Sequence, residues 1–159
     1  MGTETKNLFI SHVHEDDDRL QGLKDLLRDN GYDIRDGSID SSKPNDAQSP
    51  DYIWSEILLP RIRWAGTMLV LISPKTHESD WVEREIEAAH QQDKRIVGVY
   101  AQGGQESDLP ENFQLYGDAL VGWQADRIMD AVSGKVNNWY RPDGSELRAP
   151  RTIDRYSCN

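Results

Sequence analysis

The stretch Thr67-Met68-Leu69-Val70-Leu71-Ile72-Ser73 is apolar at every position between its two polar ends, and Pro74 follows it directly. A strand with one solvated face alternates polar and apolar side chains, whereas a strand covered on both faces is apolar throughout. Residues 67–73 therefore predict the central strand of a parallel sheet with helices on both faces. Pro74 ends this strand because proline has no amide hydrogen to donate to a neighbour.

Four more strands are expected around the central one. Short apolar runs at 7–11 and 32–35 precede it, and similar runs at 95–100 and 119–123 follow it. Three predicted helices, each with apolar residues at helical spacing, accompany these strands. Their apolar residues are Leu20, Leu23, Leu26 and Leu27; Ile53, Ile57 and Leu58, in a helix kinked or ended by Pro60; and Ile128, Met129, Val132 and Val136. This alternation predicts a three-layer, flavodoxin-like α/β fold with a five-stranded parallel sheet in the order 2-1-3-4-5.

The chain divides into one predicted domain, residues 1–139, and a polar C-terminal tail, residues 140–159. The tail is assigned from its polar composition and its prolines and glycine. Within the domain, the segment 36–49 is rich in Ser, Asp, Asn and Gly. Loops of this length in compact domains are commonly functional or mobile, so residues from this segment are candidates for a site.

Composition excludes several classes of protein. The formal net charge is -10 and no Lys/Arg stripe is present, which argues against a nucleic-acid partner. No apolar run is long enough to span a bilayer, and the first residues lack a signal-peptide pattern, so a cytoplasmic protein without membrane contact is predicted. The single cysteine, Cys158, excludes an internal disulfide and makes a zinc-cysteine site implausible.

Residues 79–89, SDWVEREIEAA, predict the start of a helix after the central strand. Asp80 is expected to cap its first turn, and Glu83 to reach back as in a capping box. The stripe facing the core is Val82, Ile86 and Ala89. Trp81 and Glu85 then lie together along the edge of this stripe. Partial burial there would raise the pKa of Glu85 unless charged or hydrogen-bonding partners opposed it.

In the predicted strand order, ligands bind beyond the carboxyl ends of the first and third strands. The segments expected there are Ser11 with His12, the loop from Asp36, and Ser73 leading into the helix that carries Glu85. A metal site built from His12, His14 and the aspartates at 16–18 has a spacing that matches no closed site, and we expect no metal.

Several enzyme and regulator classes with related folds do not match this crevice. A response-regulator receiver needs an aspartate after the central strand and a lysine after the next one, where this chain has Ser73 and Tyr100. A G-x-G-x-x-G dinucleotide motif and a P-loop are absent from the sequence, as is a serine or cysteine in a glycine-flanked elbow.

The chain resembles the TIR domain, and more closely the TIR-like family of small bacterial and archaeal proteins. Four pieces carry the resemblance: Phe9-Ile10-Ser11-His12 with the acidic residues after it, Gly31-Tyr32-Asp33-Ile34, Leu69-Val70-Leu71-Ile72-Ser73-Pro74, and Ser79-Asp80-Trp81-Val82-Glu83-Arg84-Glu85-Ile86. TIR domains of bacteria and plants often cleave NAD between nicotinamide and ribose, with a catalytic glutamate that closes a W-x-x-x-E motif. The resemblance places that motif at Trp81 and Glu85.

The resemblance also implies the other participants. It makes Glu85 the catalytic residue and assigns substrate binding to Phe9, Ser11, His12, Ser38 and Trp81. NAD is then the substrate, and no separate cofactor is expected. A small stand-alone TIR-like protein resembles the signal-producing subunit of the Thoeris antiphage system, whose cyclic ADP-ribose-type product activates a separate effector protein; self-association is a further expectation. Two alternatives stay open: a non-catalytic TIR-like interaction module, and a nucleoside deoxyribosyltransferase-like enzyme.

Overall fold

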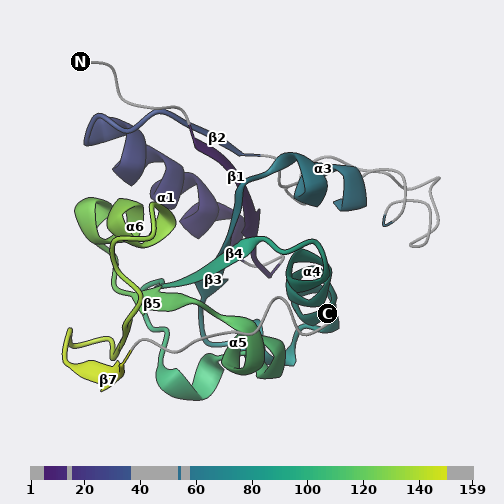
Figure 1. The fold of residues 1–159 in the computed structure, drawn as a ribbon. Helices are drawn as coiled ribbons and strands as arrows, with labels where there is room; N and C mark the ends of the chain where they lie inside the picture. Colours follow the sequence, from purple (N-terminus) through teal and green to yellow (C-terminus); the bar gives the residue numbers. More distant parts are fainter. Residues whose placement is uncertain (1–5, 14–15, 37–53, 55–57, 150–159) are drawn as a thin grey trace.

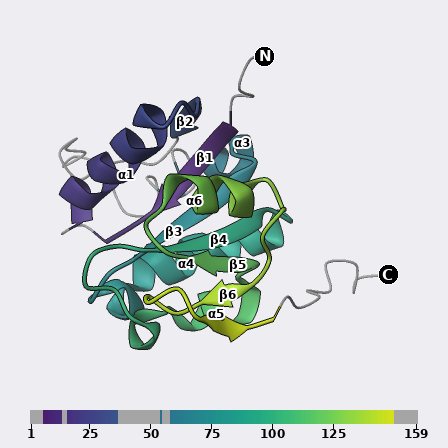
Figure 2. The same ribbon diagram turned by 90° about the vertical axis from the view of Figure 1, so that its left-hand side faces the viewer.

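A computed structural model of the chain describes residues 6–13, 16–36, 54 and 58–149. Its core is a seven-stranded sheet in the order β2-β1-β3-β4-β5-β6-β7. The strands are β1 (Lys6–Ser11), β2 (Ile34–Asp36), β3 (Thr67–Ile72), β4 (Arg95–Tyr100), β5 (Ala119–Val121), β6 (Trp139–Tyr140) and β7 (Glu146–Arg148). Every neighbouring pair is parallel except β6 and β7, and Figure 2 shows the strands in succession from β2 to β6.

Helices cover both faces of this sheet (Figure 1). On one face lie α1 (Asp17–Asp29) and α6 (Ala125–Val132), and on the other lie α3 (Leu59–Trp64), α4 (Asp80–Gln91) and α5 (Glu111–Tyr116). Two 3-10 turns, η3 (Thr76–Glu78) and η4 (Glu106–Asp108), follow β3 and β4. All six residues of β3 are buried, which confirms the central strand expected from its apolar sequence.

The flavodoxin-like fold and the order of the first five strands are confirmed, but the prediction of a five-stranded sheet is wrong by two strands. The additional strands form a hairpin from residues assigned to the end of the domain and to the polar tail. Trp139 is fully buried and its ring lies 4.9 Å from that of Phe113 on α5, while the Arg148 guanidinium lies 4.3 Å above the indole. This one large apolar side chain anchors residues 140–149 to the sheet despite their polar composition.

The ends of the helices also differ from expectation in two places. Pro60 lies in the first turn of α3, where its missing amide hydrogen costs nothing, whereas it was expected at a kink or end of a helix; residues 53 and 57 of that expected helix lie outside the described residues. The cap of α4 is Ser79 rather than Asp80: its hydroxyl oxygen accepts a hydrogen bond from the Val82 amide at 3.1 Å. The described residues include no helix both long enough and apolar enough to cross a membrane.

Glu83 does not close a capping box on its own helix. Its two carboxylate oxygens accept hydrogen bonds from the backbone amides of Glu111, at 2.9 Å, and Asn112, at 2.8 Å, which open α5. The Asn112 side chain returns a bond to the Glu83 carbonyl oxygen at 2.9 Å. A negative charge on free amides at a helix start is favourable, so Glu83 fastens α5 to α4.

Candidate functional site

Glu85 is a residue of α4, on the side of the helix that faces the sheet. Val82, Ile86 and Ala89 are fully buried and hold this face of α4 against the apolar strands. Only 4% of Glu85 is exposed, so its carboxyl group is buried rather than placed at the edge of the core. Ser11, the last residue of β1, donates a hydrogen bond from its hydroxyl to Glu85 Oε1 at 2.6 Å.

Burial determines the protonation of this carboxyl group. Removal from water raises the pKa of Glu85 to about 8, and the bond from the Ser11 hydroxyl opposes the increase. At neutral pH Glu85 is therefore mostly the neutral acid in the free protein. A positive charge brought next to it would favour the ionised form.

Trp81 lies one helical turn before Glu85 and is half-buried at the rim of the core. Its ring meets Trp54 edge to face, with 5.6 Å between the ring centroids. The Arg84 guanidinium lies 4.1 Å from the centre of the Trp54 ring and 5.7 Å from that of Trp81. The rings of Trp54 and Trp81, with the Arg84 guanidinium near both, thus lie together beside the start of α4.

The remaining residues named from the sequence are not all gathered around Glu85. Phe9 is 1% exposed and packs in the core beneath α4, so it supports the site from below and offers no open surface. Ser38 lies outside the described residues.

His12 is fixed to the start of α1. Its Nδ1 lies 3.1 Å from the Ile10 carbonyl oxygen, and its Nε2 lies 3.0 Å from Asp17 Oδ1. His12 thus joins the end of β1 to the first turn of α1.

A buried polar network at the same edge of the sheet was missed by the sequence analysis. Asp16, 1% exposed, accepts a hydrogen bond from the Ser73 hydroxyl and a second from Arg19 Nη1 at 2.6 Å. The Ser73 backbone amide donates a hydrogen bond to Thr76 Oγ1 at 2.8 Å, and the Thr76 hydroxyl donates to the Leu71 carbonyl oxygen at 3.0 Å. The network joins the carboxyl end of β3 to the start of α1. In the sequence, Asp16 is one of three consecutive aspartates, and nothing local distinguishes it from the other two.

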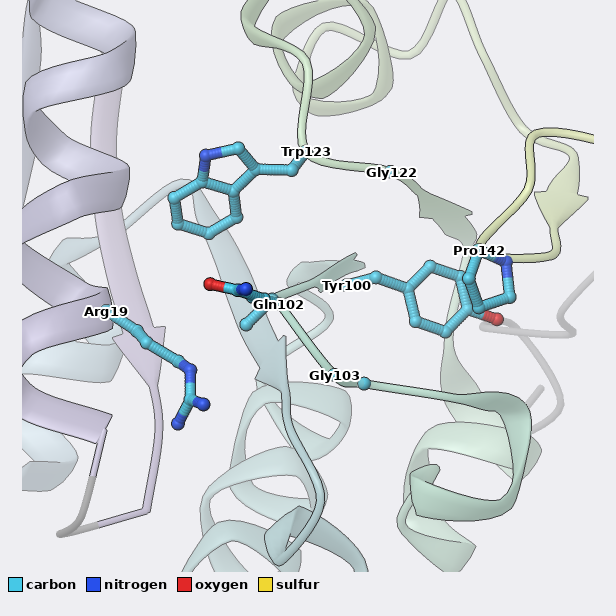
Figure 3. A pocket seen from close by; sticks show the side chains of 9 residues that line it. Arg19, Tyr100, Gln102, Gly103, Gly122, Trp123 and Pro142 are labelled. Carbon is cyan, nitrogen blue, oxygen red and sulfur yellow. The ribbon is translucent and has the colours of Figure 1, made fainter.

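A cavity of about 470 Å³ opens at the carboxyl ends of β4 and β5, on the α1 side of the sheet. Figure 3 shows the side chains of Arg19, Gln102 and Trp123 around one space, with Tyr100 and Pro142 beside it. This position is displaced along the sheet from the crevice that the strand order predicts beyond β1 and β3. Residues 37–49 of the loop expected over that crevice lie outside the described residues.

Comparison with known families gives one match. Residues 9–106 match the family described as Thoeris protein ThsB, TIR-like domain, and this range covers more than half of the chain. No curated protein matches the chain.

Solved structures of similar fold have low sequence identity. A conserved protein from Enterococcus faecalis V583 is 12% identical, with a TM-score of 0.56 over 84% of this chain and 100% of that one. The TIR domain of a Toll-related receptor from Hydra magnipapillata is 12% identical, with a TM-score of 0.49 over 80% and 92%. A CMP N-glycosidase from Clostridium botulinum is 16% identical, with a TM-score of 0.41 over 61% and 73%. Of these three, only the Enterococcus faecalis protein has a TM-score above 0.5, and at 12% identity that likeness concerns the fold alone.

Proposed function

Since the chain belongs to the family of the TIR-like domain of Thoeris protein ThsB, we propose that it consumes NAD and makes a cyclic ADP-ribose-type signal in antiphage defence. The reaction is cleavage of the bond between nicotinamide and ribose, with Glu85 as the catalytic residue. The observation that carries the proposal is the buried Glu85 carboxyl group, bonded to Ser11 at the carboxyl end of β1.

The chemistry requires only one carboxylate. Ordinary glycosidases use a pair, because one acid must protonate the leaving oxygen. Nicotinamide leaves from a pyridinium, so the pair of electrons in the broken C–N bond neutralises the ring, and no proton is needed. What remains is the positive charge that develops on the ribose, and an ionised carboxylate in a dry site stabilises such charge far better than one in water.

The raised pKa of Glu85 fits a cationic substrate. Because burial raises the pKa of Glu85 to about 8, its carboxyl group is mostly neutral before substrate binds. A bound pyridinium favours the carboxylate, so substrate binding and release of one proton are linked. The charge then lies beside the ribose only when substrate is present. Ser11, bonded to Oε1, keeps the carboxyl group in one orientation.

The fate of the ribosyl cation defines the product. Capture by water gives ADP-ribose and a proton, whereas capture by another nucleophilic atom of the same nucleotide closes a ring and gives a cyclic ADP-ribose isomer. A cyclic product would leave as a diffusible signal for a separate effector protein. Trp81, Ser11, His12 and Ser38 are proposed to contact the substrate, and self-association of the chain is proposed from the family.

The test is release of nicotinamide from NAD by the purified chain, followed by chromatography and mass spectrometry of the nucleotide product. We expect Glu85→Gln to abolish release and Glu87→Gln, an exposed glutamate on the same helix, to leave it unchanged. A fully active Glu85→Gln protein would remove the assignment of Glu85. A wild-type protein inactive on NAD but exchanging bases between deoxynucleosides would favour a deoxyribosyltransferase, and one inactive on both would favour the interaction module.

A further inference from the structure

The cavity at the carboxyl ends of β4 and β5 lies away from Glu85. Glu85 and Ser11 lie on the face of the sheet that α4 covers, whereas Arg19 and Trp123 line the cavity from α1 and from the residue pair after β5. A Cβ atom at Gly22 of α1 would lie 3.7 Å from the Trp123 indole, an ordinary van der Waals contact, so the indole packs against this turn of α1. The cavity is thus a separate hollow on the opposite face.

Three properties of the cavity suit a ligand. Its volume, about 470 Å³, falls within the range of roughly 300 to 1,000 Å³ typical of small-molecule sites. It lies beyond the carboxyl ends of parallel strands, where ligands bind in open α/β sheets. Gly103, Gly104 and Gly122 form part of its wall, so a bound molecule can approach the backbone without meeting side chains.

The polar groups of the lining point to the chemical class. Trp123 is 36% exposed and offers an aromatic face, and the Gln102 amide faces the same space (Figure 3). Arg19 is held in place by Asp16, which is itself fixed by Ser73, while 40% of the Arg19 side chain stays exposed. A stacking surface, an amide that can both donate and accept, and a pre-oriented guanidinium together match a base and a phosphate.

One buried group of the lining lacks a partner. Tyr100 is 3% exposed, and its hydroxyl makes no hydrogen bond to any of the residues that the structure describes. Its ring lies beside Pro142, at the end of the cavity opposite Arg19 (Figure 3). The ring packs with the core on the α4 side of the sheet and turns away from the space between Arg19 and Trp123, so this hydroxyl is not among the proposed ligand contacts.

We propose that this cavity binds a nucleoside 5′-phosphate, with the base against Trp123 and the phosphate on Arg19. The inference does not rest on the proposed cleavage of NAD. The nucleotide used as the probe is AMP, and a bound adenylate can come from two sources, a free mononucleotide or the adenylate half of NAD, which the experiment distinguishes.

Binding is tested by calorimetric titration of the full chain with AMP and with adenosine. Arg19→Gln should weaken AMP binding at least tenfold and change adenosine binding less than twofold, because only AMP carries the phosphate. Trp123→Ala should weaken both at least tenfold. Matched controls are Arg63→Gln and Trp64→Ala, two exposed side chains on α3, which should bind AMP as wild type does.

A further variant blocks the cavity without removing any contact, so a loss of binding in it cannot be due to unfolding. A Cβ atom at Gly122 has no atom within 4 Å, so Gly122→Leu adds a side chain to the open space beside the cavity. It should abolish AMP binding with an unchanged thermal unfolding midpoint. A raised KM for NAD in this variant assigns the cavity to the adenylate half of NAD, and an unchanged KM assigns it to a free nucleotide. The proposal is overturned, whatever the activity on NAD, if wild type does not bind AMP. It is also overturned if Trp123→Ala and Gly122→Leu bind AMP as tightly as wild type does.

Discussion

The hydroxyl of Ser11 donates to Glu85 Oε1 at 2.6 Å, across 74 positions of the sequence. The bond joins the end of β1 to the middle of α4, and among the residues that the structure describes it opposes the effect of burial on the pKa of the Glu85 carboxyl group. It therefore fixes the orientation of this group and limits how far burial raises its pKa.

The pH dependence of NAD cleavage should reveal this control. The pKa of Glu85 is raised to about 8 in the free protein, and the proposed reaction needs the carboxylate, so kcat/KM should rise with pH through about 8. Ser11→Ala removes the opposing bond, and its midpoint should move to higher pH, with about tenfold less activity at pH 7 for each unit of displacement. Ser11→Thr retains a hydroxyl and should restore the midpoint. Identical profiles for the alanine variant and wild type would contradict the role of the bond.

The stability of the folded chain should also depend on Glu85. Its pKa is higher when folded than when unfolded, where 4.5 is the ordinary value, so the folded state retains a proton that the unfolded state releases. Stability from this group is complete below about pH 4.5 and is lost as pH rises to about 8. The slope is at most about 1.4 kcal/mol per pH unit.

Glu85→Gln remains neutral and should escape this loss. From pH 5 to pH 9, its free energy of unfolding should improve relative to wild type by roughly 4 kcal/mol, as measured by urea denaturation at each pH. Glu87→Gln, which changes an exposed side chain on the same helix, should follow wild type. Parallel pH curves for Glu85→Gln and wild type would show that the group is not buried in solution.

Removal of the Glu83 carboxylate should loosen α5. In Glu83→Ala the amides of Glu111 and Asn112 lose their acceptors, which should cost about 1 to 3 kcal/mol of unfolding free energy. Hydrogen exchange at these two amides should accelerate more than at the centre of α4. Glu87→Ala should change stability by less than about 0.5 kcal/mol. Equal losses for the two alanine variants would mean that the Glu83 bonds add nothing beyond helix propensity.

Local sequence patterns predicted the fold where a single property decides the outcome. The apolar run at 67–72 can be satisfied only in a strand covered on both faces, and the order of the first five strands followed from the alternation of strands and helices. The hairpin of β6 and β7 had no such pattern. Its strands have two and three residues, and it depends on one buried side chain, Trp139.

The candidate site was predictable only in part, because its interactions are distant in sequence. The helix that carries Glu85 could be found from spacing, yet the depth of its burial depends on Ser11 and the strands below it. Asp16 and Glu83 looked like ordinary acidic residues of a first turn. Nothing local distinguishes a carboxylate facing water from one that accepts bonds from Ser73 or from the start of α5.

Two glycines beside the cavity give opposite expectations for the same substitution. A Cβ atom at Gly104 would lie 2.2 Å from the Ile72 carbonyl oxygen, which belongs to the end of β3 and cannot move without disturbing the sheet. Gly104→Ala should therefore cost about 1 to 3 kcal/mol, the usual penalty of overpacking. Gly122→Ala meets open space and should change the free energy of unfolding by less than about 0.5 kcal/mol. Urea denaturation of the two variants measures both values, and equal stability would show that the turn after β4 is not held against β3 as closely as the structure has it.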